Sequence, residues 1–287
     1  MKREVELLGQ VPPETHGAEI TVLDISMAVN AAALRALLEG GNRVRWFDHH
    51  EAGRVPKSGL LEAHLDASPS VCTSLLVDRH LGGRERLWAI AAAFGDNLSE
   101  RAQELAAGLA APEIEALQEI GETLNYNAYG EERADLCAWP AEVYHDLHAY
   151  TAPFDYRKRS TLFARIFSQK QKDEGALRAA QEIYRGAEGV VLALDEGAAA
   201  RRLLGIFANE IARREPALAH GVLVRLKSGG FRVSLRAPLE RPCGASRLAL
   251  QFPSGGGRAG AAGINHLPES DRDLFISKFK EAFAPPC

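Results

Sequence analysis

The feature that most constrains the fold is a pair of short, β-branched apolar runs separated by a segment rich in alanine and leucine. Ile20–Ile25 (ITVLDI) and Arg43–Phe47 (RVRWF) are typical of buried parallel strands. Between them, Ala28–Glu39 predicts a helix that ends at Gly40-Gly41. Strand, helix and strand together take about thirty residues, the size of one βαβ unit. The chain therefore begins as an α/β protein.

The following segments continue this alternation. Ser70–Leu81 predicts a helix, and Leu87–Phe94 is an apolar, strand-like segment. Glu100–Ala110 and Pro112–Leu124 predict two more helices, the second with proline in its first turn, where proline is favoured. The first half therefore predicts a mainly parallel sheet covered by helices.

The second half changes character. Residues 151–188 are strongly charged and helical in pattern, and predict either a connector between two domains or one more helix of a single domain. Val190–Leu194 predicts a strand, and Ala198–Arg214 predicts a long helix. Val222–Leu226 and Phe231–Leu235 flank a Lys-Ser-Gly-Gly turn, which is a hairpin signal.

A glycine-rich loop at Gly255–Gly263 and a closing helix at Ser270–Phe283 complete the chain. The expected fold is α/β: a parallel-sheet domain over 1–150, a helical connector over 151–188, and a smaller mixed-sheet α/β domain over 189–287.

Composition excludes several classes of protein. With 46% hydrophobic and 25% charged residues, the 287-residue chain is typical of a globular protein. No apolar run approaches the roughly 18–20 residues of a membrane span, and the N-terminus lacks the apolar core of a secretory signal. The net charge of −4 argues against a basic protein that coats nucleic acid, although a local basic cleft stays open.

The cysteines favour a reduced, cytoplasmic setting. None of them forms a C-x-x-C pair, which argues against a zinc ribbon, and no export signal precedes them. The four positions are Cys72, Cys137, Cys243 and Cys287.

Acidic and imidazole side chains follow three apolar segments. These are Asp24, the cluster Asp48-His49-His50, and Asp96. The carboxyl ends of parallel strands face the ligand crevice of an open sheet, so these groups are expected to meet there. They could bind Mn²⁺ or Mg²⁺, and such ions lower the pKa of a bound water and hold a phosphoryl oxygen. Taken alone, a strand-end aspartate such as Asp24 is more often a helix cap.

Several other polar groups have both a functional and a structural interpretation. His64 and Asp66 could line the crevice or cap the following helix. His145 and His148 form an H-x-x-H that is more simply a surface pair, and the Tyr/Asn segment 125–129 could stack a base or be structural.

The motifs resemble those of the DHH phosphoesterases, the superfamily of the RecJ exonuclease, nanoRNA-degrading oligoribonucleases, cyclic dinucleotide phosphodiesterases and manganese pyrophosphatases. Phe47-Asp48-His49-His50 resembles the family signature, Val22–Ser26 (VLDIS) its second motif, and Ala93–Asn97 (AFGDN) its fourth. The C-terminal half is similar to the DHH-associated domain, which has an arginine-ending strand, a helix, GGGH and AAG. Its counterparts here are Val233–Arg236, Gly255–Arg258 and Ala261–Gly263.

The resemblance implies roles in the first domain. Asp24 would bridge two Mn²⁺ ions, and His49 and Asp96 would bind one of them. His50 would contact the scissile phosphate or help to protonate the leaving group. Asp48 would orient the neighbouring histidine.

It also implies a substrate site in the second domain. The glycines Gly255, Gly256 and Gly257 would let backbone N–H groups approach a phosphate or sugar, and Arg236 and Arg258 would pair with phosphate oxygens. His266 is a further candidate for the cleft.

Two departures from the family pattern stand out. Arg258 replaces the usual histidine; it can bind phosphate but cannot donate a proton near neutral pH, since its pKa exceeds ~12. The family's first motif, D-x-D, has no counterpart, because Met1–Leu23 contains no aspartate. Either the start site is mis-assigned, which the retention of the other motifs favours, or the chain is a truncated homologue with fewer metal ligands.

The expected function is hydrolysis of phosphodiester or phosphoanhydride bonds in short oligonucleotides or small nucleotides, with Mn²⁺ or Mg²⁺ as cofactor. The competing hypothesis is a catalytically impaired protein that binds nucleotide or single-stranded nucleic acid. The expected partners are a small phosphorylated substrate or a short single-stranded oligonucleotide, and no membrane. The oligomeric state is open, a homodimer included.

Overall fold

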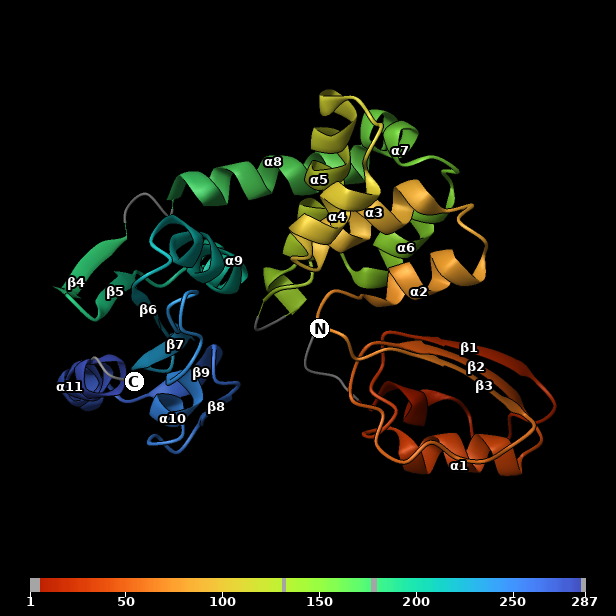
Figure 1. The fold of residues 1–287 in the computed structure, drawn as a ribbon, viewed down its shortest axis with the longest axis horizontal. Coiled ribbons are helices and arrows are strands. Elements are labelled where there is room, and N and C mark those ends of the chain that lie inside the picture. The colour runs from red at the N-terminus through yellow and green to blue at the C-terminus, as the bar shows by residue number, and fades with distance from the viewer. Residues whose placement is uncertain (1–5, 131–132, 177–179, 285–287) are drawn as a thin grey trace. The chain divides into compact units, whose positions relative to one another are not determined.

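The computed structural model describes residues 6–130, 133–176 and 180–284. The chain forms two compact units (Figure 1). The first contains residues 1–128 and 138–166, and the second contains residues 129–137 and 167–287.

The first unit has a small sheet followed by a helical part. Its strands and helices are β1 (Glu19–Leu23), α1 (Ala31–Glu39), β2 (Arg43–Asp48), β3 (Leu61–Leu65), α2 (Thr73–His80), α3 (Arg86–Gly95), α4 (Ser99–Leu105), α5 (Ala111–Tyr126), α6 (Pro140–His148) and α7 (Pro153–Arg159). Helix α8 (Thr161–Ala176) begins in this unit and ends in the second.

The sheet of the first unit is parallel, with strand order β1-β2-β3. Val22 of β1 pairs with Trp46 of β2, and Trp46 pairs with Ala63 of β3. Helix α1 lies against one face and α2 against the other (Figure 1). Val22 and Trp46 are buried with Leu34 of α1 in a common apolar core, so the β-branched and aromatic residues of the predicted strands form that core.

Helices α3 and α5 pack unusually closely in the helical part of this unit. A Cβ built on Gly121 of α5 would lie 1.9 Å from the carbonyl oxygen of Ala91, and one built on Gly95 would lie 2.7 Å from the carbonyl oxygen of Gly121. The two backbones therefore touch at these glycines, and this contact fixes the end of α3.

The second unit is built on one mixed sheet. Its elements after α8 are β4 (Gln181–Gly186), β5 (Gly189–Leu194), α9 (Ala198–Arg214), β6 (Ala219–Arg225), β7 (Phe231–Arg236), α10 (Ala245–Ala249), β8 (Gly255–Gly257), β9 (Ala261–Leu267) and α11 (Arg272–Phe283). The strand order is β4-β5-β6-β7-β9-β8, with β5 and β6 parallel and the other pairs antiparallel.

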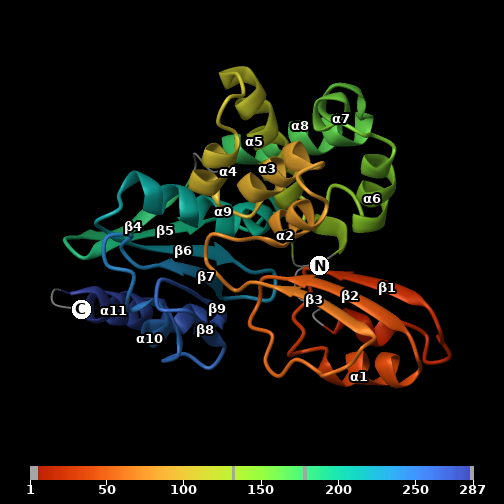
Figure 2. The same cartoon turned by 45° about the vertical axis from the view of Figure 1, so that its right-hand side comes forward.

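Helices cover both faces of this sheet. Helix α9 packs on β6 and β7 from one side, and α10 and α11 cover the other side (Figure 2). Phe275, Phe279 and Phe283 of α11 are fully buried in the core of this unit, whereas Leu274 is exposed. The fold is thus α/β, with a parallel sheet in one unit and a mixed sheet in the other, as predicted.

Three predicted elements are wrong. Leu87–Phe94 is not a strand but the centre of α3, because its alanines favour a helix and can be buried against α5. Residues 181–186, expected to continue the charged helix, form the edge strand β4. The glycine-rich loop is instead the hairpin of β8 and β9, and β3 was not predicted.

Among the described residues, no helix is both long and apolar enough to cross a membrane. Cys72 is a buried free thiol, and Cys137 is partly buried. Cys287 lies outside the residues that the structure describes.

Candidate metal centre

The carboxyl ends of the three parallel strands meet at one edge of the first unit's sheet. The Asp24 N–H donates to the Phe47 carbonyl (3.0 Å), and the Asp66 N–H donates to the Asp48 carbonyl (3.2 Å), so the ladder continues beyond each strand end. Asp24, Asp48 and the two histidines after it are therefore brought to a common edge, as the parallel topology predicts.

Asp24 is held in a specific conformation. Its φ is +60°, in the left-handed region that aspartate tolerates better than most residues. The hydroxyl of Thr73, at the start of α2, donates to Asp24 Oδ1 at 2.8 Å. The carboxylate is otherwise well exposed, so one oxygen is anchored while the group stays open to solvent or a ligand.

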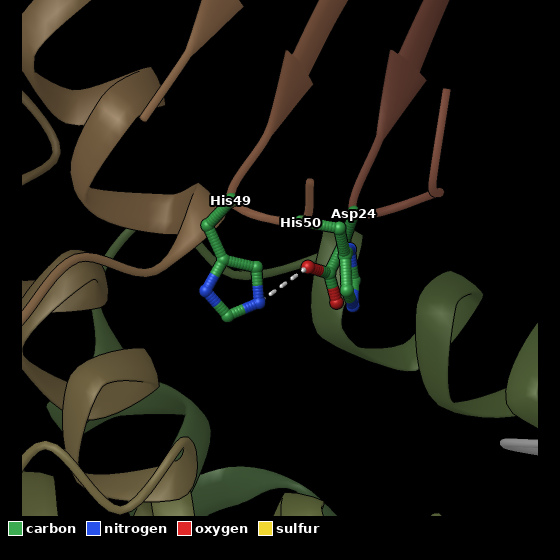
Figure 3. A group of neighbouring side chains, drawn as sticks. All are labelled: Asp24, His49 and His50. Atoms are coloured by element: carbon green, nitrogen blue, oxygen red, sulfur yellow. Dashed lines mark ion pairs between the residues drawn. The ribbon is translucent and has the colours of Figure 1, made fainter. Parts of the chain in front are cut away.

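His49 presents one ring nitrogen to Asp24. Its Nδ1 lies 2.9 Å from the backbone carbonyl oxygen of Val71. A carbonyl can only accept, so Nδ1 carries the proton in this contact, and Nε2 of the neutral ring keeps its lone pair. Nε2 lies 3.4 Å from Asp24 Oδ1 (Figure 3). This is the tautomer that a metal ligand requires.

His50 is arranged in the same way through a different partner. Its Nδ1 is 2.6 Å from Asp48 Oδ1, and that oxygen also accepts the His49 backbone N–H at 2.9 Å. Asp48 is completely buried, and its Oδ2 finds no hydrogen-bond partner among the described residues. The aspartate thus orients both the His50 ring and the chain between the histidines, and it leaves Nε2 of a neutral His50 available.

Together these contacts assemble a three-residue donor set. Asp24, His49 and His50 each offer one ligand atom, and these atoms all lie within 4.8 Å of one another. One carboxylate and two imidazoles with fixed tautomers suit a divalent cation such as Mn²⁺. The residues fit one ion; a pair of ions would need further oxygen ligands.

Asp96 lies beside this cluster rather than within it. It follows α3 as its C-terminal cap residue, and Asn97 after it has a φ of +62°. Asp96 Oδ2 is 3.9 Å from Nδ1 of His49, the nitrogen that faces Val71, whereas Asp24 faces Nε2. The structure therefore brings His50, rather than Asp96, into the donor set with Asp24 and His49.

A cavity of about 820 Å³ opens beside the cluster within the first unit. Asp24 and Asp96 line it, with α3 and α5 contributing Ala91, Gly95 and Gly121. Trp88, Asn125, His148 and Tyr150 lie in the same wall. The cavity therefore combines a carboxylate edge with an apolar and aromatic surface.

The charge of this lining is negative. Asp78 and Glu85 join Asp24 and Asp96, and the described lining residues include no lysine or arginine. Such a surface favours a cation and repels a bare phosphate. Cys72 also lines the cavity, but burial raises the pKa of its thiol, so it is protonated at neutral pH and a poor ligand.

In the second unit, the three glycines of β8 differ in what surrounds them. A Cβ at Gly255 would lie 1.7 Å from the Ala249 carbonyl oxygen, and one at Gly257 (φ +139°) would lie 2.4 Å from Ala262 Cα. A Cβ at Gly256 would meet nothing within 4 Å. Packing thus requires glycine at 255 and 257, whereas Gly256 borders open space.

The two arginines of the motif also differ in whether the rest of the protein engages them. Arg236 donates to Asn209 Oδ1 (2.6 Å), Ser234 Oγ (3.1 Å) and the Leu235 carbonyl (2.8 Å), and burial lowers the pKa of its guanidinium. Arg258 is exposed, and its side chain has no hydrogen bond or ion pair within the described part of the chain.

His266 lies away from both arginines. Arg236 pairs with Ala261 at the start of β9, and the Arg258 N–H donates to the Ala261 carbonyl. His266 is five residues further along β9, roughly 17 Å away for an extended strand, and its Nε2 lies 3.2 Å from the Gly229 carbonyl oxygen. The structure therefore does not group His266 with Arg236 and Arg258.

Sequence reasoning missed two groups that position the cluster. Thr73 and the Val71 carbonyl come from the segment that enters α2, more than twenty residues after His49. A threonine at the start of a predicted helix is a usable signal, because hydroxyl side chains near helix starts make specific hydrogen bonds. A backbone carbonyl leaves no signal in the sequence.

Solved structures share this fold, although neither a family model nor a curated protein matches the sequence. The chain is similar to a DHH domain described as a member of a family of ribosomal proteins, with TM-score 0.60 and 17% identity over 91% of this chain and 68% of that one. It is also similar to a pGpG-specific phosphodiesterase from Vibrio cholerae, with TM-score 0.51 and 12% identity over 93% of this chain and 99% of that one. An exopolyphosphatase-related protein from Bacteroides fragilis shows a weaker likeness, with TM-score 0.46 and 16% identity over 94% and 72% of the two chains.

These likenesses establish the class of fold. The chain has the fold of DHH-domain proteins, and the likeness spans nearly all of it. The fold that the motif resemblance implies is thus confirmed.

Proposed function

We propose that the chain is a metal-dependent phosphoesterase that hydrolyses phosphodiester or phosphoanhydride bonds in short oligonucleotides or small nucleotides. The observation that carries this proposal is the convergence of Asp24, His49 and His50, with each imidazole held through Nδ1 and with Nε2 of His49 facing the Asp24 carboxylate. The fold supports the same class of activity, since a structural neighbour is a phosphodiesterase.

The negative charge of the cavity lining explains why a bound cation would be needed for a phosphate to bind. When bound, a divalent ion such as Mn²⁺ would supply Lewis acidity and positive charge for a phosphoryl oxygen. Without that charge, the carboxylates around the cavity would repel a phosphate, Asp78 least of them because it pairs with Arg86 at 2.6 Å. Substrate binding in the first unit is therefore expected to depend on the metal.

Residues around the candidate metal centre would have separate roles in positioning the ligands and in proton transfer. Thr73 keeps Asp24 Oδ1 in place, and the Val71 carbonyl fixes the tautomer of His49. His50 is oriented by the buried Asp48. Its Nε2 would either bind the ion through its lone pair or, where Asp96 takes that place in the ligand set, carry a proton to a leaving oxygen. Asp96, beside His49, would orient that ring or add a carboxylate to the ligand set.

The lining and the second unit favour a small substrate. Trp88 and Tyr150 provide aromatic surface for a base within a cavity of about 820 Å³, a size suited to a nucleotide. The unengaged guanidinium of Arg258, next to the open face of Gly256, is suited to a phosphate oxygen.

A second function, binding without cleavage, is supported by the number of ligands. The described residues gather one carboxylate and two imidazoles at this edge, fewer oxygen ligands than a two-ion site uses. A chain with a single ion or none would still offer the cavity of the first unit to a nucleotide.

The deciding experiment loads the full-length chain with Mn²⁺ and measures bound metal by mass spectrometry and turnover of dinucleotides, cyclic dinucleotides and polyphosphate. The phosphoesterase proposal expects metal at a stoichiometry of at least one and metal-dependent cleavage. Asp66→Asn, at the third strand end, is a matched control, because Asp66 is partly exposed at the same edge but outside the cluster.

Metal binding and nucleotide binding without turnover would contradict the enzymatic proposal and favour the binding protein. Loss of metal from His49→Ala, with unchanged metal in Asp66→Asn, would place the ion at the proposed cluster.

A further inference from the structure

A second group of metal-ligand side chains lies outside the centre described above. It consists of Glu62 and His64 on β3 and His80 in the last turn of α2, and one ligand atom from each lies within 4.8 Å of the others. Glu62 Oε1 is 2.7 Å from His64 Nε2 and 3.9 Å from His80 Nδ1. The three groups are partly exposed, so an ion and a water molecule can reach them.

The two rings are held in place by a buried aromatic residue. Phe47 of β2 pairs with His64 in the parallel register, and their rings stack at 4.5 Å with an interplanar angle of 5°. His80 meets the edge of Phe47 at 5.2 Å and of His64 at 4.8 Å. Because Phe47 is almost completely buried, it orients both imidazoles against a rigid surface.

The carboxylate is oriented from the other side. Glu62 is the register partner of Arg45, whose Nε lies 2.9 Å from Glu62 Oε2. This contact takes one oxygen and leaves Oε1 directed at the imidazoles.

We propose that Glu62, His64 and His80 bind one Zn²⁺ ion, with water at the fourth position. Two histidines and one glutamate form an established zinc donor set with an open position. With bonds of about 2.0–2.1 Å, a tetrahedral ion separates its ligand atoms by about 3.4 Å. The observed separations of 2.7 and 3.9 Å lie on either side of that value, so small side-chain movements complete the site. Two imidazoles favour Zn²⁺ over Mg²⁺, which prefers oxygen ligands.

The site would join two elements that also serve the first cluster. It ties the C-terminal end of α2 to β3, while the N-terminal end of α2 carries Thr73, which holds Asp24. Phe47, under the two rings, is followed directly by Asp48 and His49 on the same strand. Zinc would therefore act as a clamp that stabilises the segments positioning the candidate metal centre.

The test uses the full-length chain carrying His49→Ala, which removes the first cluster as a competing site. Zn²⁺ binding is measured by competition with a chromogenic chelator, and Co²⁺ substitution reports the geometry through its visible absorption. We expect one Zn²⁺ per chain, a tetrahedral Co²⁺ spectrum, and an affinity at least about 100-fold lower after His80→Ala, since even outer-shell changes cost 10–100-fold.

His145→Ala is the matched control, because His145 is an exposed histidine of the same unit that contacts Tyr144 and belongs to neither ligand group. It is expected to leave Zn²⁺ affinity unchanged. If His80→Ala does not fold by circular dichroism, Glu62→Gln takes its place, since the amide oxygen can still accept from Arg45. Absence of zinc binding in the parent, or equal affinity in the parent and the ligand variant, would overturn the proposal.

Discussion

The strand-end cluster of the first unit and the glycine strand of the second use their motif residues in opposite ways. In the first, hydrogen bonds to neighbouring residues hold Nδ1 of His49 and Nδ1 of His50. The Nε2 atoms of both rings are left available to a ligand. In the second, Gly255, Gly257 and Arg236 are required by packing and hydrogen bonding, so only Gly256 and Arg258 remain open.

The difference shows that some residues of a motif are required by the fold, whereas others are free to bind a ligand. At the strand ends, fixed tautomers and a buried aspartate prepare a donor set. Along β8, two of three consecutive glycines are explained by backbone contacts alone. Mutations can separate these cases because structural residues change stability, whereas functional residues change binding or turnover.

The largest effect is expected from Asp24→Asn. Asparagine tolerates the left-handed φ of +60° and keeps the side-chain shape, so the melting temperature should hardly change. Removing the only carboxylate of the donor set is expected to lower metal-dependent turnover at least about 100-fold. Steady-state kinetics and thermal denaturation of the same preparation check this; retained turnover would remove Asp24 from the site.

The two neighbouring glycines should give contrasting results. Gly255→Ala places a methyl group 1.7 Å from the Ala249 carbonyl oxygen and is expected to lower the free energy of unfolding by about 3 kcal/mol. Gly256→Ala meets no atom within 4 Å and should change it by less than about 1 kcal/mol. Denaturant titration measures both. If Gly256→Ala weakens nucleotide binding at unchanged stability, its open face is a binding surface; equal destabilisation by the two variants would refute the distinction.

The arginines extend this contrast to side chains. Arg258→Ala is expected to raise the KM roughly 10-fold with the fold intact, since it removes one charge-assisted contact to phosphate. Arg236→Ala is expected to destabilise the second unit by about 1–3 kcal/mol, because Asn209 and Ser234 lose their hydrogen-bond partner. An unchanged KM in Arg258→Ala would count against its role in binding.

The smallest effect concerns Cys72 in the cavity wall. Burial raises the pKa of this thiol in the folded state above its ordinary value of 9.0. The unfolded chain therefore ionises first, so the stabilisation is complete below about pH 9 and is lost as pH rises through the folded pKa. Unfolding measured between pH 8 and 10 should show a steeper loss of stability for the wild type than for Cys72→Ala. Identical pH profiles would contradict the effect of burial.

The sequence predicted the fold where hydrophobic pattern and local preference agree. The β-branched runs became β1 and β2, and Ala198–Arg214 became α9 with the same bounds. Leu87–Phe94 was misread because a short apolar run fits a buried strand or a buried helix equally well. The strand β4 was missed because pairing with β5, a non-local contact, outweighs the charged, helix-like composition of Gln181–Gly186.

The candidate site was predictable to a similar extent. Strand ends identified Asp24, His49 and His50, because parallel topology brings such positions together. The orientation of the His49 ring depends on the Val71 carbonyl, and that of the His50 ring depends on Asp48. The position of Asp96 depends on the path of α3. These features depend on tertiary contacts and could not be predicted from the sequence. The same holds for the contact between His80 of α2 and His64 of β3.

The close contact of α3 and α5 at Gly95 and Gly121 limits how the size of the cavity can vary among related proteins. At these two positions the cavity wall is main chain against main chain, and a side chain at either glycine would collide with backbone atoms. Adaptation to a larger or smaller occupant is expected at other lining positions, such as Trp88 and His148. Relatives with different preferences should therefore vary there while keeping the two glycines.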